Sequence, residues 1–115
     1  YDSYNKALTY TDSSIRLAAM YPNVYMEPGA LGADRAEEVV HDFVRKVKEA
    51  GVIDKMIYGS DGPQMPGYMG KHLEAYVNAM KDEGYTADEM RLVLADNYVR
   101  VFGIPPIELN AEPKT

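Results

Sequence analysis

One amphipathic stretch between two short apolar runs most constrains the fold of this chain. Between residues 38 and 48 the apolar side chains recur at helical spacing, with charged side chains on the opposite face. The apolar positions are Val39, Val40, Phe43, Val44 and Val47. Runs 23–27 and 52–58 flank this helix, and their apolar and aromatic side chains are typical of strands covered on both faces. A helix between two such strands predicts a βαβ unit, with parallel strands and a right-handed crossover.

One more helix is predicted before this unit and one after it. The first follows Asp12 or Ser13 and ends before Pro22, because the residue before a proline is pushed out of the α region. The second lies between a loop rich in Gly, Pro and Met at 62–70 and the helix-ending Gly84. Every predicted element is therefore short enough to belong to one layered α/β arrangement.

A last helix begins with a capping box, Thr86 and Glu89, and ends at Gly103. The buried stripes expected for the last two helices are Leu73, Tyr76, Val77 and Met80, then Met90, Val93, Leu94, Tyr98 and Val101. His41 and His72 are expected at the solvent edges of their helices, because each lies beside rather than on these stripes.

Length and composition limit the class of protein. The chain has 115 residues and no internal duplication, which fits one domain. Its formal net charge of −6 argues against a non-specific grip on nucleic acid or on an anionic membrane, since both need clustered Lys and Arg. No apolar run reaches the roughly 20 residues of a membrane span, and no signal peptide is visible. Cysteine is absent, which excludes a disulfide scaffold and a Cys-ligated zinc site. A cytoplasmic protein without nucleic-acid or membrane partners is predicted.

Asp61 is the first candidate functional residue. The run 52–58 stops at Gly59, and Asp61 follows on a turn with a second glycine, Gly62. In parallel α/β folds ligands and chemistry lie at the carboxyl ends of strands, so a carboxylate there is a candidate for acid–base work. The alternative is a structural one, in which Asp61 caps the turn by bonding the backbone of 62–64.

Three segments together resemble one known family. They are Tyr-Pro-Asn-Val-Tyr at 21–25, Met-Ile-Tyr-Gly-Ser-Asp-Gly-Pro at 56–63 and Asp-Asn-Tyr-Val-Arg-Val-Phe-Gly-Ile at 96–104. Their order and spacing resemble the end of the amidohydrolase superfamily, in the branch of metal-dependent hydrolases and aromatic-acid decarboxylases. The resemblance implies an α/β fold: the C-terminal portion of a TIM-like (β/α)₈ barrel, with about two parallel strands and four helices. Residues 1–104 would form that portion, and 105–115 a C-terminal tail.

The resemblance also implies a role for Asp61 and a cofactor. The matching aspartate of the family lies on or beside a divalent metal, commonly zinc, and takes a proton from metal-bound water or protonates the substrate. Asp61 is therefore predicted as both catalytic residue and metal ligand. The family's His-x-His has no counterpart in this chain, whose two histidines lie 31 positions apart (41 and 72). Its other ligands are expected from upstream sequence or from another chain.

Three further residues are candidates for contact with a small-molecule substrate. Glu27 ends the run 23–27 and would face the same mouth as Asp61, although a surface ion pair is the alternative. Met65 and Tyr68 follow Asp61 in the loop 62–70, where soft apolar and aromatic side chains suit a pocket for an aromatic ligand. Packing beneath the loop explains them as well. Arg100 is expected to pair with a carboxylate such as Asp96 or Glu108.

The sequence leaves three functions open. The first is hydrolysis of an ester, amide or lactone by a metal-activated water, with Asp61 as base and then acid. The second is non-oxidative decarboxylation of an aromatic acid on the same fold. The third is a non-catalytic interaction module completed by a partner chain. A two-stranded parallel sheet would also leave unpaired backbone groups at its edges, so neighbouring strands, from further sequence or from a homo-oligomer, are expected.

Overall fold

The computed structural model describes residues 9–29, 37–60 and 66–104. Its helical elements are α1 (Thr9–Met20), α2 (Glu37–Glu49), a 3₁₀ turn (Ile53–Lys55), α3 (Tyr68–Asp82), α4 (Ala87–Arg91), a π turn (Leu92–Asp96) and α5 (Asn97–Phe102). The last three follow one another without a break and form one continuous helical stretch. In the described part of the chain, no helix combines the length and the hydropathy that crossing a bilayer requires.

The predicted barrel portion with two parallel strands is wrong for the described residues. They contain no strand and no sheet, only one isolated parallel bridge between Met26 and Met56. In that bridge the N–H of Met26 donates to the carbonyl of Lys55, and the N–H of Ile57 donates to the carbonyl of Met26, both over 2.8 Å. The pairing stays this short because the 3₁₀ turn takes residues 53–55 out of the extended conformation and Pro28 lacks an N–H.

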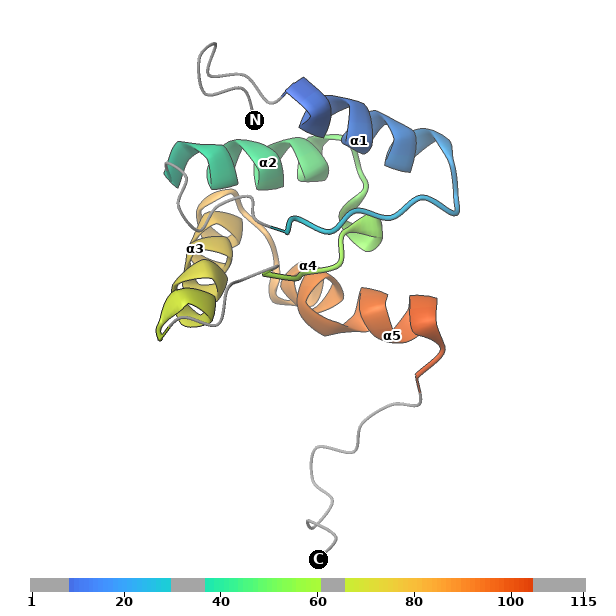
Figure 1. Cartoon of the computed structure of the whole chain (residues 1–115). Coiled ribbons are helices and arrows are strands. Elements are labelled where there is room, and N and C mark those ends of the chain that lie inside the picture. The colour runs from blue at the N-terminus through green and yellow to red at the C-terminus, as the bar shows by residue number, and fades with distance from the viewer. Residues whose placement is uncertain (1–8, 30–36, 61–65, 105–115) are drawn as a thin grey trace, which may run out of the picture.

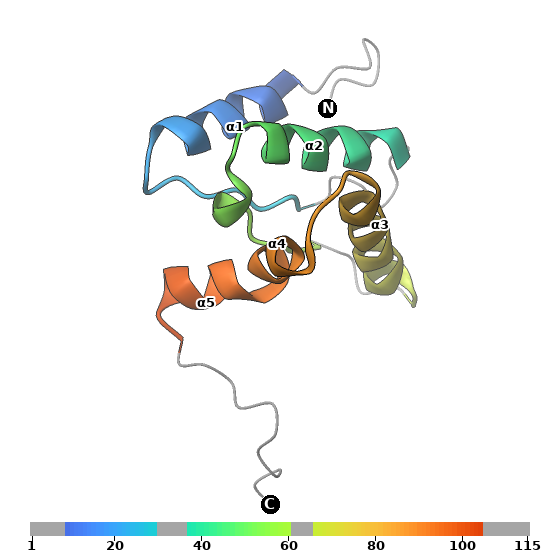
Figure 2. The same ribbon diagram turned by 180° about the vertical axis from the view of Figure 1, so that it is seen from behind.

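The extended segments around this bridge lie between two helical groups. Figures 1 and 2 show α1 and α2 on one side of segments 21–29 and 52–60, and the stretch from α4 to α5 on the other side. Helix α3 packs against α2 at one end of the molecule. The two segments are therefore covered by helices from both sides, as strands of a layered fold would be.

The buried stripe predicted for α2 is confirmed. All five of its apolar side chains are at most 3 % exposed. Four of them, Val40, Phe43, Val44 and Val47, join a core to which α1, the extended segments and α3 contribute Ile15, Ala18, Met26, Val52, Ile53, Met56, Tyr76, Ala79 and Met80. Full burial of one such side chain stabilises the fold by about 1.5–3 kcal/mol, so this stripe is the main source of cohesion between α2 and its neighbours.

The predicted ends of the later helices are confirmed, but their buried faces are partly wrong. Thr86 and Glu89 form the expected capping box, and Gly84 has a φ of 81° just after α3. The expected core residues Leu73, Leu94 and Tyr98 are instead 41 %, 38 % and 46 % exposed. His72 and Asn97 are fully buried next to them. Each helix is thus turned by about one residue from the prediction, toward a polar side chain.

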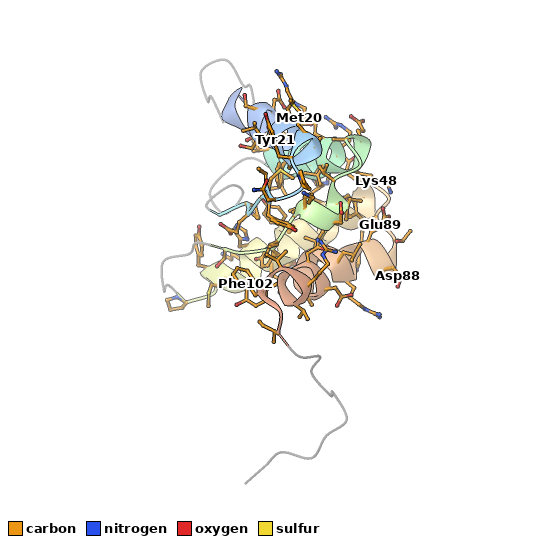
Figure 3. All side chains as sticks on the ribbon, turned by 90° about the vertical axis from the view of Figure 1, so that its right-hand side faces the viewer. Met20, Tyr21, Lys48, Asp88, Glu89 and Phe102 are labelled. Atoms are coloured by element: carbon orange, nitrogen blue, oxygen red, sulfur yellow. The ribbon has the colours of Figure 1, made fainter. Side chains whose placement is uncertain are left out.

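Two lysines on the surface connect elements that are distant in the sequence. Lys48 of α2 donates to the carbonyl of Gly84 and lies 3.6 Å from the carboxylate of Glu89, on the side of the molecule seen in Figure 3. Lys55 donates to three carbonyls after α1, those of Tyr21, Pro22 and Val24, over 3.1, 2.7 and 3.3 Å. Lys55 therefore holds the turn between α1 and the bridge in place.

Candidate functional site

Two of the four predicted site residues lie in the described part of the chain. Glu27 ends the first extended segment, and Tyr68 is the first residue of α3. Asp61 and Met65 lie outside the described residues, so their assignments stay predictions. The described residues nearest to Asp61 in the chain are Gly59 and Ser60, which continue the second extended segment.

The carboxylate of Glu27 lies directly against Gly59. Its Oε1 accepts a hydrogen bond of 2.8 Å from the N–H of Gly29. A Cβ added at Gly59 would lie 2.3 Å from the same Oε1, which is closer than van der Waals contact allows. Glycine at 59 is therefore needed for close approach, and Glu27 lies beside the backbone that leads, two residues later, to Asp61.

His72 connects the ends of both extended segments. Its Nε2 lies 2.9 Å from the carbonyl oxygen of Gly29, and its Nδ1 lies 2.8 Å from the hydroxyl of Tyr58. Because a carbonyl can only accept, Nε2 must carry the proton. In the neutral ring Nδ1 is then the acceptor, and the hydroxyl of Tyr58 donates to it. The two bonds fix the tautomer of a histidine that is fully buried.

Aromatic rings surround this histidine. The ring of Tyr76 stacks on it with centroids 4.9 Å apart and planes 22° apart. Tyr58 meets Tyr76 edge to face, with centroids 5.7 Å apart, and the ring of Tyr68 lies 6.4 Å from His72. Such offset and edge-to-face pairs contribute about 0.5–1.5 kcal/mol each beyond the burial of their area. The cluster of Tyr58, Tyr68, His72 and Tyr76, called the aromatic cluster below, is a rigid wall beside Glu27.

Burial keeps two phenols of this cluster, those of Tyr58 and Tyr76, protonated. It raises the pKa of Tyr58 above its ordinary value, with smaller electrostatic contributions from Glu27 and Tyr68. Burial also raises the pKa of Tyr76 well above its ordinary value, with smaller contributions from Tyr58 and Glu27. Of the residues predicted to contact substrate, Tyr68 belongs to this cluster and Glu27 lies against Gly59.

Sequence patterns did not reveal the role of His72. The prediction that His72 lies at a solvent edge is wrong, because this residue is fully buried. His41 is half-buried, and its Nε2 lies 3.0 Å from a carboxylate oxygen of Asp82. A signal for His72 exists in the sequence: it stands four residues before Tyr76, so the stripe of His72, Tyr76, Ala79 and Met80 has helical spacing too. Hydropathy alone favoured Leu73 over it.

Asn97 and Arg100 are further residues whose roles the sequence did not reveal. The Nδ2 of Asn97 donates to the carbonyls of Ile53 and Met56, each over 2.8 Å. The predicted ion pair of Arg100 with Asp96 is not formed: the Nη2 of Arg100 donates instead to the carbonyl of Asp54 over 2.6 Å. Glu108, the other predicted partner, lies outside the described residues. The segment 96–104, which carries part of the family resemblance, therefore forms hydrogen bonds to the backbone just before the candidate site.

The described residues do not fit a metal ion. Among residues 9–29, 37–60 and 66–104 no group of three His, Asp or Glu side chains comes together as a ligand set. Both ring nitrogens of His72 are taken by Tyr58 and Gly29, and the Oε1 of Glu27 is taken by Gly29. A zinc ion held by Asp61 stays a prediction, and no chemical step is derived through it.

The arrangement offers an exposed carboxyl group and a directed phenol. Glu27 is exposed and lies against the backbone of Gly59, before Asp61 in the chain. Tyr58 is half-buried, and its proton points to His72. Groups of this kind bind and orient polar substrates and hold protons at defined atoms.

Comparison with known proteins gives the family. A family model described as amidohydrolase matches residues 2–104, which is nearly the whole chain. No curated protein and no solved structure gives a significant match. Because the family model covers far more than half of the chain, the predicted resemblance is confirmed: the chain belongs to the amidohydrolase family.

Proposed function

We propose that this chain carries the acid–base residue of a hydrolase that cleaves an ester, amide or lactone bond in a small molecule. Asp61 is that residue. One observation supports it best: the carboxylate of Glu27 lies against Gly59, so the two extended segments meet two positions before Asp61 in the sequence. Membership of the amidohydrolase family supports the class of reaction.

In the proposed reaction Asp61 moves one proton twice. Its carboxylate takes a proton from a water molecule as the water oxygen bonds to the carbonyl carbon of the substrate. The bond from that carbon to the leaving oxygen or nitrogen then breaks, and the carboxyl group of Asp61 gives the proton to the leaving atom. The atoms of water are divided between the two products, and no oxidation or reduction takes place.

Glu27, Met65 and Tyr68 are the proposed substrate contacts. Glu27 is exposed and Tyr68 is half-buried, so each keeps polar atoms that a ligand can reach. The ring of Tyr68 lies near His72, which bonds the carbonyl of Gly29, and the N–H of Gly29 bonds Glu27; this chain of contacts supports a common binding region beside the aromatic cluster. Met65 is proposed from the sequence alone. In this proposal the site is completed by further residues from outside residues 1–115. It holds a divalent metal such as zinc. The enzyme is cytoplasmic.

A substitution at Asp61 tests the proposal. The natural protein is assayed with aryl esters, anilides and lactones, and separately with aromatic carboxylic acids for release of CO₂. Asp61→Asn keeps the shape and removes the base, so we expect turnover of the best ester, amide or lactone to fall by about 10²–10⁴-fold. Asp96→Asn, at an exposed position of the π turn, is the matched control and should leave turnover within about twofold.

Two results would overturn this function. Unchanged hydrolysis by Asp61→Asn would remove Asp61 from the chemistry. Release of CO₂ that depends on Asp61, without hydrolysis of any of the three bond types, would assign the chain to a decarboxylase.

A further inference from the structure

The segment that leads to Asp61 is bonded along both of its edges. On one edge the bridge to Met26 uses the carbonyl of Lys55 and the N–H of Ile57. On the other edge the carbonyl of Met56 accepts from Asn97, and the N–H of Tyr58 donates to the carbonyl of Val93 over 3.0 Å. Backbone groups of an extended chain point alternately to its two sides. The helical stretch from α4 to α5 therefore occupies the place of a neighbouring strand.

The π turn makes the carbonyl of Val93 available. In a regular α-helix the N–H of Asn97 would bond the carbonyl of Val93, four residues back. Here the N–H of Asn97 bonds the carbonyl of Leu92, five residues back. The carbonyl of Val93 is thereby released to accept from Tyr58. Single π turns of this kind appear mostly inside α-helices and are frequent at functional sites.

The amide of Asn97 can bond both carbonyls in one orientation only. Both groups that it meets, the carbonyls of Ile53 and Met56, are acceptors, so its NH₂ must face them. Its Oδ1 is left buried, without a hydrogen-bond partner among the described residues. A buried polar atom without a partner destabilises a fold, so this residue type is not explained by packing. Its two donations give the reason for an amide at this position.

We propose that Asn97, together with the π turn at Val93, is a positioning device that sets the register of residues 53–58 and thereby the place of Asp61. Asn97 is a positioning residue and touches no reacting atom. Arg100 adds a third bond of the same kind, to the carbonyl of Asp54. This inference rests on the proposed function for its catalytic consequence, whereas the register itself is measured without any substrate.

Hydrogen exchange in the natural protein tests the register. Asn97→Leu keeps a similar shape and removes both donors, and Asn78→Leu, at an exposed position of α3, is the matched control. We expect the amide of Tyr58 to exchange at least about tenfold faster in Asn97→Leu, the consequence of losing about one net hydrogen bond. The amides of Val44 and Val47 in α2 should change by less than about threefold, because a local loss does not act on the whole fold.

A second variant separates positioning from general stability. Asn97→Asp has one O–H donor when the introduced carboxyl is protonated and none when it is ionised. Relative to the natural protein at the same pH, protection of Tyr58 should therefore be kept at low pH and lost as the introduced carboxyl ionises. If an enzyme assay is in hand, turnover per folded molecule of Asn97→Leu should fall about tenfold or more, with KM within about threefold.

Each outcome decides the inference. Equal changes at Tyr58 and at α2, or no change at Tyr58, would overturn it whatever the activity is. If Asn97→Leu fails to fold, the natural protein still decides: the amides of Tyr58 and Ile57 should be similarly protected, and an unprotected Tyr58 would exclude the bond to Val93. Absence of hydrolysis by the natural protein would count against the proposed function, and the exchange data would stand apart from it.

Discussion

The backbone N–H of Tyr58 donates to the carbonyl of Val93 over 3.0 Å, and that carbonyl is available because the helix around Val93 opens into a π turn. One edge of the segment before Asp61 is thus satisfied by a helix. The sequence predicted neighbouring strands there, because a two-stranded sheet leaves its outer edges unpaired. The outer backbone groups of residues 56–58 do need hydrogen-bond partners, and a backbone carbonyl and a side-chain amide of the helical stretch supply them.

Gly59→Ala tests the contact between the two extended segments. The new Cβ would lie 2.3 Å from the Oε1 of Glu27, so this side chain must turn away and lose its bond to Gly29. We expect the free energy of unfolding to fall by about 1 kcal/mol, the net value of one hydrogen bond. Chemical denaturation measures it. Gly70 lies inside α3, and a Cβ added there meets nothing within 4 Å. Gly70→Ala should therefore leave the free energy of unfolding unchanged or raise it.

His72→Phe tests the aromatic cluster. The phenyl ring keeps most of the volume and the stacking on Tyr76, but it leaves the hydroxyl of Tyr58 and the carbonyl of Gly29 without their partner. We expect a loss of about 2–4 kcal/mol in the free energy of unfolding, because two groups lose their bonds. Thermal or urea unfolding measures the change. The control His41→Phe acts on an exposed pair with Asp82 and should cost less than about 1 kcal/mol; equal losses would contradict the role given to His72.

Lys55→Met tests the turn after α1. The ammonium group donates to three carbonyls and lies 4.8 Å from the centre of the Tyr25 ring. We expect a loss of about 1–2 kcal/mol, since charged hydrogen bonds at a helix end and a cation–π contact disappear together. Lys71→Met, at an exposed position of α3, is the control. Exchange of the Met26 amide should also become faster in Lys55→Met, because the turn precedes the bridge.

Glu89→Gln tests the capping box through its pH dependence. The backbone N–H of Thr86 donates to Glu89 over 2.8 Å, and this bond is the main reason that the pKa of the carboxyl lies below its ordinary value, with a smaller effect of Lys48. A lowered pKa in the folded state contributes stability above the pKa of the unfolded state. That stability disappears as the pH falls through the folded value.

The measurement for Glu89 is a series of unfolding curves from neutral to acidic pH. At neutral pH the free energy of unfolding of the natural protein should exceed that of Glu89→Gln by less than about 1 kcal/mol, because the carboxyl is solvent-accessible. The difference should vanish at acidic pH, when the carboxyl is protonated. A difference that grew toward acidic pH would contradict this assignment.

Local signals in the sequence predicted the helices well. The stripe of α2, the capping box at Thr86 and the helix end at Gly84 depend on side chains and backbone within a few residues, which periodicity captures. The two predicted strands are not formed in the described residues: segments 23–27 and 52–58 share only one parallel bridge, between Met26 and Met56. A 3₁₀ turn at 53–55, which has no distinctive sequence signal, interrupts the second segment.

The candidate site was less accessible to prediction because its polar residues bond distant backbone. His72 meets Gly29, 43 positions away, and Asn97 meets Ile53, 44 positions away. Patterns of hydropathy treat both as surface residues and prefer Leu73 and Tyr98 for the core. Only the folded chain shows that backbone carbonyls lie at these positions, where a polar side chain is more stable than an apolar one.

The two ring nitrogens of His72 hold the hydroxyl of Tyr58 and the carbonyl of Gly29 at fixed positions around one rigid imidazole. The ends of the two extended segments therefore keep a fixed separation, since neither can shift without breaking a bond to the same ring. A ligand that contacts both segment ends would find them preorganised, so the entropy of aligning them is lost during folding and does not weaken binding.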